Sequence, residues 1–319
     1  MAKTRIAVFG VGHMGRFHAE KFAAMKDAAR GGVGEAELVA VADADAKRAA
    51  DVAALHGCAH AADYRTLLAG IDAACVAVPT GKHREVVLAC LEAGVHVLVE
   101  KPLARTLDEA DDMLALARAK ERVLQVGHLQ RFNPAFQALA AEPARPLFID
   151  IERLAPFKAR STDIDVILDL MIHDLDLALA LARAPLEQVS ASGFRVLTDS
   201  IDIANARLEF ADGCIASLSA SRVSQAAVRK LRVFKHDGYV SANLQEQKLR
   251  HVRKGPAGIE QTEQAFARVD ELQAQAGAFV RAVRGGAAPQ AGGEQGRQVL
   301  ALALQVARLV DERLARHGA

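Results

Sequence analysis

The segment VFGVGHMGRFHAEKF, residues 8–22, decides the fold class of this chain. It places Gly10, Gly12 and Gly15 in the spacing G-x-G-x-x-G, after a short apolar run and at the start of an amphipathic stretch. Where a strand turns into a helix, the first glycine permits the tight turn, the second lets the backbone approach a pyrophosphate, and the third lets helix and strand pack closely. The amide groups at the helix N-terminus then face the phosphate charges. The segment therefore predicts a dinucleotide-binding turn, and a glycine-rich turn without a ligand is the alternative.

Short apolar runs alternate with amphipathic stretches up to about residue 125. The runs occupy residues 5–10, 37–43, 73–79, 96–101 and 123–127. Strands that alternate with helices form a parallel sheet that is covered on both faces. We therefore predict an α/β fold whose first domain, residues 1–125, is an NAD-binding Rossmann domain with a doubly wound parallel sheet.

The second half of the chain has a different rhythm. Strand-like runs follow one another without helices between them, at residues 188–197, 202–210, 214–222, 228–235 and 239–244. The tripeptides ADG at 211–213 and HDG at 236–238 are hairpin turn signals. Consecutive strands joined by hairpins predict a C-terminal α+β domain over residues 126–319, with a large, mostly antiparallel sheet. An uncovered face on such a sheet would favour a homodimer or a homotetramer.

Composition excludes several classes of function. Of the 319 residues, 51% are hydrophobic and 25% are charged, and a net charge of +1 gives no large field to attract nucleic acid or an acidic membrane. The apolar runs are too short to span a bilayer, and the N-terminal run passes directly into the glycines, which makes it a poor signal peptide. The four cysteines lack a C-x-x-C spacing, and no Cys/His cluster indicates a metal. We expect a cytoplasmic protein with free thiols and no metal, whose partner is a small molecule.

An acidic residue ends the second apolar run and bears on the choice of cofactor. Asp43 stands where a carboxylate can accept hydrogen bonds from the adenine ribose hydroxyls and repel a 2′-phosphate, which favours NAD over NADP. Lys47 and Arg48 follow one turn later and could tolerate a phosphate. We prefer to interpret these two cations as a solvated helix face.

A polar stripe interrupts the apolar segment VILDLMIHDLDLALALA, residues 166–182. At about 100° per residue, Asp169, His173 and Asp176 fall within roughly 60° of one another on a helix, and Asp174 points elsewhere. A stripe of this kind faces a cleft or a partner, or it is a solvated edge with a His–Asp pair. The segment by itself leaves these interpretations open.

Two further runs end in residues suited to a ligand-binding edge. VPTGKH, residues 78–83, and VEKP, residues 99–102, each close a strand, and loops at the carboxyl ends of parallel strands line the ligand crevice. Lys101 precedes a proline, which favours extended geometry. A lysine at this edge is either solvated or able to bind a substrate hydroxyl and help its proton leave.

Taken together, GxGxMGxxHA, the strand-end aspartate, PTxxH, EKP and the downstream DxxxH resemble the glucose–fructose oxidoreductase/inositol dehydrogenase (Gfo/Idh/MocA) family over nearly the whole chain. The resemblance implies an NAD-dependent dehydrogenase acting on CH–OH groups, with nicotinamide and sugar in a crevice between the two domains. By motif position it makes Lys101, Asp169 and His173 the catalytic residues. His173 would be the general base, Asp169 would orient it or bind a hydroxyl, and Lys101 would stabilise alkoxide charge. The cofactor-binding residues would be Gly10, Gly12, His13, Met14, Gly15, Asp43, Pro79, Thr80, His83, Glu100 and Lys101.

A finer resemblance concerns the substrate. GHLQRFNPAFQAL, residues 127–139, and residues 153–177 look like the branch of the family that oxidises the 3-hydroxyl of UDP-N-acetylglucosamine or its uronic acid for lipopolysaccharide synthesis, although Gln130 replaces the usual glutamate. This branch implies that Arg131, Asn133 and Arg160 bind the substrate together with Asp169 and His173. A structural hydrogen bond or ion pair is the alternative for each of these residues. Two other functions stay open: a dehydrogenase of a free sugar or polyol such as inositol, and a non-catalytic dinucleotide-sensing regulator.

Overall fold

The computed structural model describes residues 2–26, 35–158, 164–286 and 288–317. These residues form two compact units. The first unit combines Met1–Leu129 with Asp270–Leu300, and the second combines Gln130–Val269 with Ala301–Ala319. No helix in the described part of the chain is both long and apolar enough to cross a membrane.

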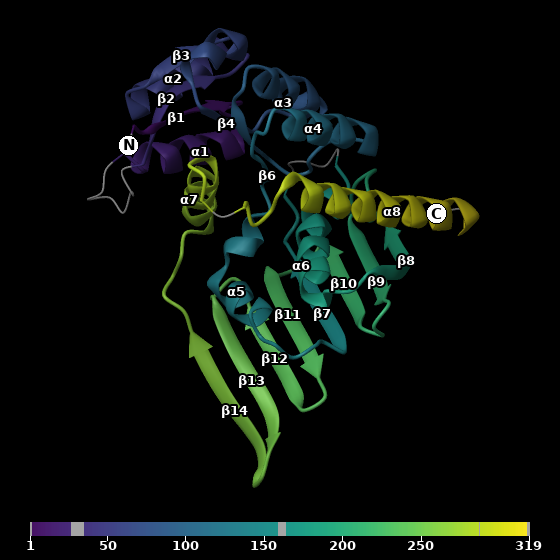
Figure 1. Ribbon diagram of the computed structural model, residues 1–319. Helices are drawn as coiled ribbons and strands as arrows, with labels where there is room; N and C mark the ends of the chain where they lie inside the picture. Colours follow the sequence, from purple (N-terminus) through teal and green to yellow (C-terminus); the bar gives the residue numbers. More distant parts are fainter. Residues whose placement is uncertain (1, 27–34, 159–163, 287, 318–319) are drawn as a thin grey trace. The chain divides into compact units, whose positions relative to one another are not determined.

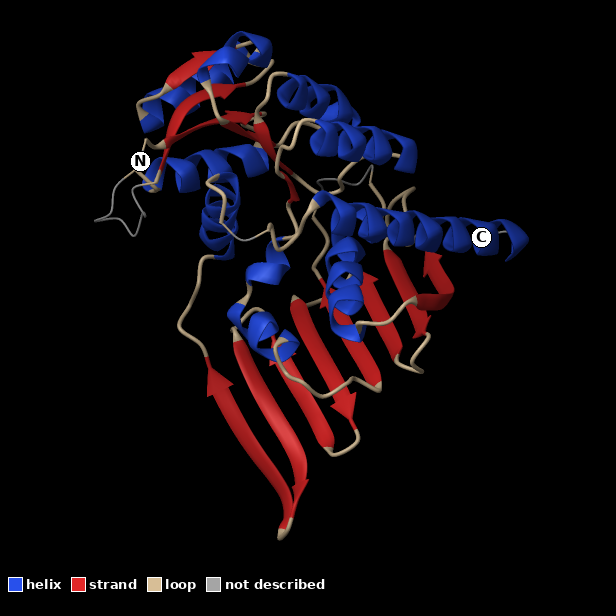
Figure 2. Ribbon diagram, in the orientation of Figure 1, coloured by secondary structure: helices blue, strands red, loops and turns tan. Residues whose placement is uncertain are grey.

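The first unit is built on a six-stranded sheet in which all neighbouring strands are parallel (Figures 1 and 2). In spatial order the strands are β3 (Ala59–Ala61), β2 (Ala36–Ala42), β1 (Thr4–Phe9), β4 (Ala73–Val76), β5 (His96–Val99) and β6 (Leu124–Val126). The predicted Rossmann sheet is confirmed, and each predicted apolar run overlaps one of these strands. β3 was not predicted, because its sequence AHA contains no large apolar side chain.

Helices cover both faces of this sheet, since all four residues of the central strand β4 are buried. The helices are α1 (His13–Ala24), α2 (Ala46–His56), α3 (His83–Glu92), α4 (Leu107–Ala119), α7 (Glu271–Val283) and the first part of α8 (Gly293–His317). Although α7 lies far along the chain, it packs against α1, and Phe279 shares a buried apolar cluster with Phe22. A helix from the C-terminal part of the chain therefore completes the core of the N-terminal sheet.

The second unit is built on an eight-stranded sheet (Figure 2). In spatial order the strands are β14 (Gly258–Ala265), β13 (Lys248–Gly255), β12 (Gly238–Asn243), β11 (Val228–Lys235), β7 (Phe148–Leu154), β10 (Ile215–Ser221), β9 (Ile203–Phe210) and β8 (Leu186–Phe194). Among these strands β7 and β10 are parallel, and the other neighbours are antiparallel. The predicted, mostly antiparallel sheet is confirmed, and both predicted hairpin turns join antiparallel neighbours.

Helices cover one face of this sheet. Along β9, exposed and buried residues alternate, as expected for a strand with one face packed and the other facing solvent. α5 (Pro134–Ala140) and α6 (Ile172–Ala182) lie on the packed face (Figure 2). The last part of α8 lies against β8, where Val310 is beside Gly193. The helix that carries the predicted polar stripe thus lies on the packed face of this sheet.

The turn after β1 allows no side chain at two of its three glycines. A Cβ on Gly10 would lie 2.7 Å from the nitrogen of Val78, and Gly10 has a φ of +82°. A Cβ on Gly15 would lie 1.7 Å from the carbonyl oxygen of Gly10, whereas a Cβ on Gly12 would meet no protein atom within 4 Å. Gly10 and Gly15 are therefore required by packing, and Gly12 leaves open space beside the backbone.

This contrast predicts different stabilities for two alanine variants. We expect Gly15→Ala to lower the free energy of unfolding by about 1–3 kcal/mol or more, because overpacking forces the helix away from the strand. Gly12→Ala should stay within about 0.5 kcal/mol of the unmodified protein, as for most open positions. Urea denaturation followed by far-UV circular dichroism measures both values. Equal losses in the two variants would contradict this packing account.

Candidate functional site

The glycine turn and the acidic strand end are joined by a hydrogen bond. Gly12 is the N-cap residue of α1, so the amide groups of His13 and Met14 are the first of that helix. Asp43 follows β2 directly, and its carboxylate accepts the main-chain N–H of Val11 at 2.9 Å. The turn that would hold a pyrophosphate and the carboxylate that would meet a ribose are therefore fixed to each other.

The two cations on α2 have different surroundings. The guanidinium of Arg48 lies 3.2 Å from the carboxylate of Asp43. Lys47 pairs instead with Asp51 at 2.7 Å, and its side chain is 83% exposed. Lys47 thus lies on a solvated helix face, in agreement with the preferred interpretation. Arg48 does not fit that interpretation fully, because it pairs with Asp43, the carboxylate that was expected to select the cofactor.

The loops after β4 and β5 lie at the same edge of the sheet and are tied together by His83. Pro79 precedes the short helix η3 (Thr80–Lys82), and His83 then begins α3. The His83 ring is buried, with Nε2 3.0 Å from the carbonyl oxygen of Val78 and Nδ1 3.0 Å from that of Pro102. Burial lowers the pKa of His83, against the effect of these hydrogen bonds. His83 therefore contacts protein carbonyls of both loops.

Glu100 and Lys101 are the first residues after β5. The main-chain N–H of Glu100 donates to the carbonyl of Val76 at 2.9 Å, and its carboxylate lies 2.6 Å from the ring of His18. The Lys101 N–H donates to the same carboxylate at 3.2 Å, and the Lys101–Pro102 peptide is cis. One sheet edge thus gathers all the predicted cofactor-binding residues of the first unit: Gly10, Gly12, His13, Met14, Gly15, Asp43, Pro79, Thr80, His83, Glu100 and Lys101.

His18 was not singled out from the sequence, although it lies within the glycine motif. It is fully buried on α1, on the same helix face as Gly15 and Phe22. A histidine on an otherwise apolar helix face was the available signal, because buried polar side chains require a partner. That partner, Glu100, is distant in sequence and could not be identified without the fold.

In the second unit, the segment with the polar stripe is not a regular α-helix. It begins with the π-helical turn η5 (Ile167–Met171) and continues as α6, so the assumed 100° per residue does not hold at Asp169. The carboxylate of Asp165 accepts the N–H of Leu168 at 2.8 Å, and burial raises the pKa of Asp165. Single π turns inside helices occur frequently at functional sites. Asp169, within this turn, and His173, just after it, are both half-buried.

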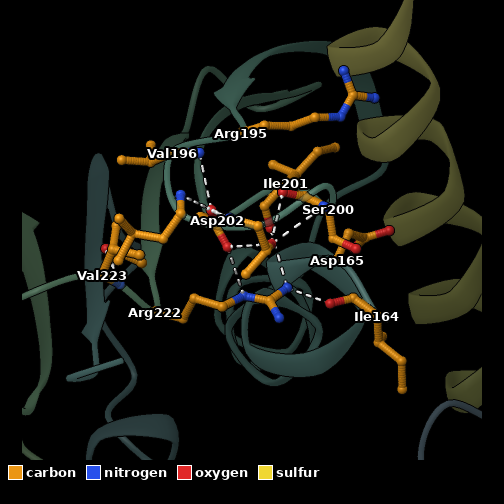
Figure 3. A network of polar contacts seen from close by, with 12 residues as sticks. Ile164, Asp165, Arg195, Val196, Ser200, Ile201, Asp202, Arg222 and Val223 are labelled. Atoms are coloured by element: carbon orange, nitrogen blue, oxygen red, sulfur yellow. Dashed lines mark hydrogen bonds and ion pairs between the residues drawn. The ribbon is translucent and has the colours of Figure 1, made fainter. Parts of the chain in front are cut away.

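A buried arginine fixes the chain just before the π turn (Figure 3). Arg222 donates to the carbonyl oxygens of Ile164 and Ile201 and lies 3.6 Å from the carboxylate of Asp202. Asp202 in turn accepts the main-chain N–H groups of residues 196–198 at 2.7–2.9 Å. The start of the helical segment is therefore anchored to the end of the sheet.

The other two carboxylates of this segment are buried in ion pairs. Asp174 pairs with Arg153 of β7, with a shortest contact of 2.7 Å. Asp176 pairs with Arg131, also at 2.7 Å, and its side chain is 1% exposed. Asp176 was placed on one polar stripe with Asp169 and His173, but it is buried in the ion pair with Arg131. Because His173 and Asp176 both lie in α6, the π turn changes only the helical phase of Asp169 relative to them.

The residues expected to bind substrate have structural partners or lie outside the described residues. Arg131 has the ion pair with Asp176. Asn133 is fully buried as the N-cap of α5, where its side chain accepts the N–H of Ala135 at 3.0 Å and donates to the carbonyl of Leu244 at 2.8 Å. Arg160 lies outside the described residues. These contacts account for Asn133 by structure alone.

Each unit presents groups suited to one part of an alcohol oxidation. The first unit offers a helix N-terminus suited to phosphates, a carboxylate suited to a ribose and a lysine after β5. The second offers a half-buried imidazole, a group that can act as a general base, with a carboxylate one turn before it. Among the described residues, no group of three or more His, Cys, Asp or Glu side chains is arranged to hold a metal ion.

Comparisons with known proteins agree with this arrangement. Residues 4–128 match the oxidoreductase family with an NAD-binding Rossmann fold, and residues 150–241 match the GFO/IDH/MocA C-terminal domain. UDP-N-acetylglucosamine 3-dehydrogenase of Acidithiobacillus ferrooxidans is 39% identical, over 99% of this chain and all of that protein. Its crystal form P212121 has a TM-score of 0.91, covering 98% of this chain and 99% of that one. Myo-inositol 2-dehydrogenase of Thermotoga maritima is 27% identical over 97% of each chain.

The two matched regions cover most of the chain, and one relative is aligned over nearly its full length. The fold of each unit is the one these matches require. This chain belongs to the Gfo/Idh/MocA family of oxidoreductases.

Proposed function

We propose that this enzyme is an NAD-dependent dehydrogenase that oxidises the C3 hydroxyl of UDP-N-acetylglucosamine, or of a related UDP-sugar, to a 3-keto sugar. The observation that carries the proposal is the 39% identity with a UDP-N-acetylglucosamine 3-dehydrogenase over 99% of this chain. A regulator that only sensed dinucleotides would have no need of Lys101, Asp169 and His173, and this chain has all three. The 3-keto group is what a later amination step would require, which fits lipopolysaccharide precursor synthesis in a reducing cytoplasm.

The roles proposed for the residues follow from their chemistry. NAD, when bound, accepts the hydride from the sugar carbon. His173 takes the hydroxyl proton, Asp169 orients its ring or binds a neighbouring hydroxyl, and Lys101 stabilises the negative charge that develops on the oxygen. Arg48 beside Asp43 allows some binding of NADP, although Asp43 favours NAD. Along β9 every second residue is exposed, so one face of the eight-stranded sheet is open to solvent. We propose that this face forms the subunit interface of a homodimer or homotetramer.

A substrate screen tests the proposal. The protein, NAD and a panel of UDP-sugars, free sugars and inositols are mixed, and NADH is followed by absorbance. We expect NADH with UDP-N-acetylglucosamine or a related UDP-sugar, and inhibition by UDP. NADH from inositol alone would support the second candidate, a polyol dehydrogenase, which the relative from Thermotoga maritima favours. NAD binding without turnover on any substrate would support a regulator.

Single substitutions test the catalytic residues. We expect Lys101→Ala and His173→Ala each to lower kcat by about 10²–10⁴-fold, because a positioned acid–base group contributes that much. NAD should still bind to both variants, as measured by fluorescence titration, and its affinity for His173→Ala should stay within about twofold of the unmodified value. Lys82→Ala and His236→Ala are matched controls, since both side chains are exposed. Full turnover in the His173→Ala protein would make this helix face a solvated edge.

The charges near Asp43 predict the preference between the two cofactors. Asp43→Ser should narrow the preference for NAD, since it removes the carboxylate that repels a 2′-phosphate. Arg48→Gln should widen the preference by about tenfold, because its cation lies 3.2 Å from that carboxylate and can pair with the phosphate. Lys47→Gln should change nothing, because Lys47 pairs with Asp51. The preference is measured as kcat/KM with NAD divided by kcat/KM with NADP. Equal kcat/KM values for the two cofactors in the unmodified protein would refute the role of Asp43.

Arg131 allows a test that separates substrate binding from structure. Arg131→Met leaves Asp176 buried without its ion-pair partner, so we expect a loss of about 3–5 kcal/mol in the free energy of unfolding. Adding Asp176→Asn should recover part of this loss. If Arg131 instead contacts the diphosphate of the substrate, KM for the UDP-sugar rises while stability is kept. Urea denaturation and steady-state kinetics on the same preparations distinguish the two roles.

A further inference from the structure

A buried histidine and a buried glutamate meet beneath the sheet edge that carries Lys101. His18 projects from α1 and Glu100 follows β5, and the His18 Nε2 lies 2.6 Å from the Glu100 Oε1. The two side chains are 1% and 13% exposed. A hydrogen bond this short between two nearly buried titratable groups is a strong, directional contact. The roles proposed above leave His18 without a function.

The second oxygen of Glu100 holds the main chain of Lys101. The Lys101 N–H donates to Glu100 Oε2 at 3.2 Å, and the Glu100 N–H donates to the Val76 carbonyl at 2.9 Å. Space around this oxygen is tight, because a Cβ on Gly127 would lie 3.0 Å from it. The carboxylate is therefore oriented by His18 through one oxygen and orients Lys101 through the other.

The charge state of the pair supports this arrangement. Burial alone would lower the pKa of His18, but interactions with Cys75 and Glu100 raise it to about 10. Burial would raise the pKa of Glu100, but the hydrogen bond and charge of His18 lower it. At neutral pH the contact is therefore an imidazolium–carboxylate pair. A charged pair fixes the direction of the carboxylate more firmly than a neutral contact would.

The main chain directly after Lys101 is held by a second histidine, His83. The ring of His83 lies 3.0 Å from the carbonyl oxygen of Pro102 and 3.3 Å from that of Leu103. Two buried histidines, from α1 and α3, thus hold the main chain on both sides of Lys101. Restraint of this kind is valuable at a reacting group, since misplacement by about 1 Å can cost about 10²-fold in rate.

We propose that His18 is a positioning residue, which fixes the main chain of Lys101 through the carboxylate of Glu100. His18 touches neither substrate nor cofactor in this role and acts through the lysine. The inference rests on the proposed function, because it gives His18 a purpose only if Lys101 takes part in catalysis. It adds a third member, distant in sequence, to the glutamate and lysine of the EKP motif.

Hydrogen exchange tests the positioning without any substrate. In His18→Leu we expect the Lys101 amide, followed in peptides spanning residues 99–104, to exchange about tenfold faster or more. His18→Gln keeps a neutral donor near the carboxylate and should recover most of the protection. The matched control is His96→Gln, because His96 begins β5 at the opposite end from Glu100 and accepts the N–H of Val123. Unchanged protection of Lys101 in His18→Leu, or an equal change in His96→Gln, would overturn the proposal.

A double-mutant cycle with Lys101→Ala tests the consequence for turnover. We expect His18→Leu to lower kcat by about 10–10²-fold with NAD affinity kept, and His18→Gln to lower it much less. In the Lys101→Ala background the same His18 substitution should change kcat by less than about twofold, because residues that act as one unit are not additive. A purely structural histidine would lower the folded fraction but not kcat per folded molecule.

The outcomes separate this proposal from the proposed function. If Lys101→Ala lowers kcat but the His18 effect persists undiminished in that background, the positioning role is refuted and the catalytic role of Lys101 stands. If Lys101→Ala keeps full turnover, the catalytic role of Lys101 and the positioning role of His18 are both refuted, while the proposed dehydrogenase activity itself stands. Should His18→Leu fail to fold, Glu100→Gln takes its place in both experiments, since it keeps the side-chain size and removes the charge that pairs with His18.

Discussion

The close approach of α1 to the end of β1 is the constraint on which the first unit depends. With the Gly15 Cα packed against the carbonyl of Gly10, no side chain fits between helix and turn. The helix therefore begins immediately after the turn, with its free amide groups at the sheet edge. The same approach carries His18, one helical turn after Gly15, to the carboxylate that follows β5. The glycine turn and the loop that carries Lys101 thus both depend on the packing of Gly15 against Gly10.

Ion pairs set the orientation of the helix in the second unit. α6 is apolar on almost every side, so hydrophobic burial alone would allow it to turn about its own axis with little cost. Asp174 and Asp176 remove this freedom, because each forms a two-pronged contact with an arginine outside the helix. Asp169 and His173 stay half-buried as a result. Buried ion pairs of this kind contribute more to a defined geometry than to stability.

Sequence patterns predicted what depends on local order along the chain. The alternation of apolar runs predicted the parallel sheet, and the two turn signals predicted the hairpins β9–β10 and β11–β12 of the antiparallel sheet. The packing of α7 against α1 could not be predicted from local sequence, because the pattern of an amphipathic helix does not show which surface its apolar face packs against. The π turn was missed for a related reason. It begins where Arg222 and Asp202 hold the chain, and these residues come long after the turn in the sequence.

For the candidate site, the sequence likewise predicted the positions of residues but not their interaction partners. Motif spacing identified the residues at the sheet edge, because parallel strands end at one edge whatever their exact lengths. It could not assign partners, so Asp176 was grouped with Asp169 and His173 although Arg131 pairs with it. Asn133 is explained by its N-cap and its bond to Leu244, contacts that no spacing predicts. A site residue is thus easier to locate than its contacts, since contacts depend on segments far apart in sequence.

The pair of His18 and Glu100 is better explained by geometry than by stability. Two apolar side chains of similar volume would fill the same space, often with equal or greater stability. They could not accept the N–H of Lys101, which the carboxylate does.

The pH range over which the pair of His18 and Glu100 is charged also suits this role. Because the pKa of His18 is raised to about 10, its stabilising effect is complete below the unfolded pKa and is lost as pH rises towards 10. Because the pKa of Glu100 is lowered, its effect is complete above the unfolded value and is lost in acid. Both effects hold at neutral pH, so the carboxylate that accepts the Lys101 N–H stays paired with His18 there.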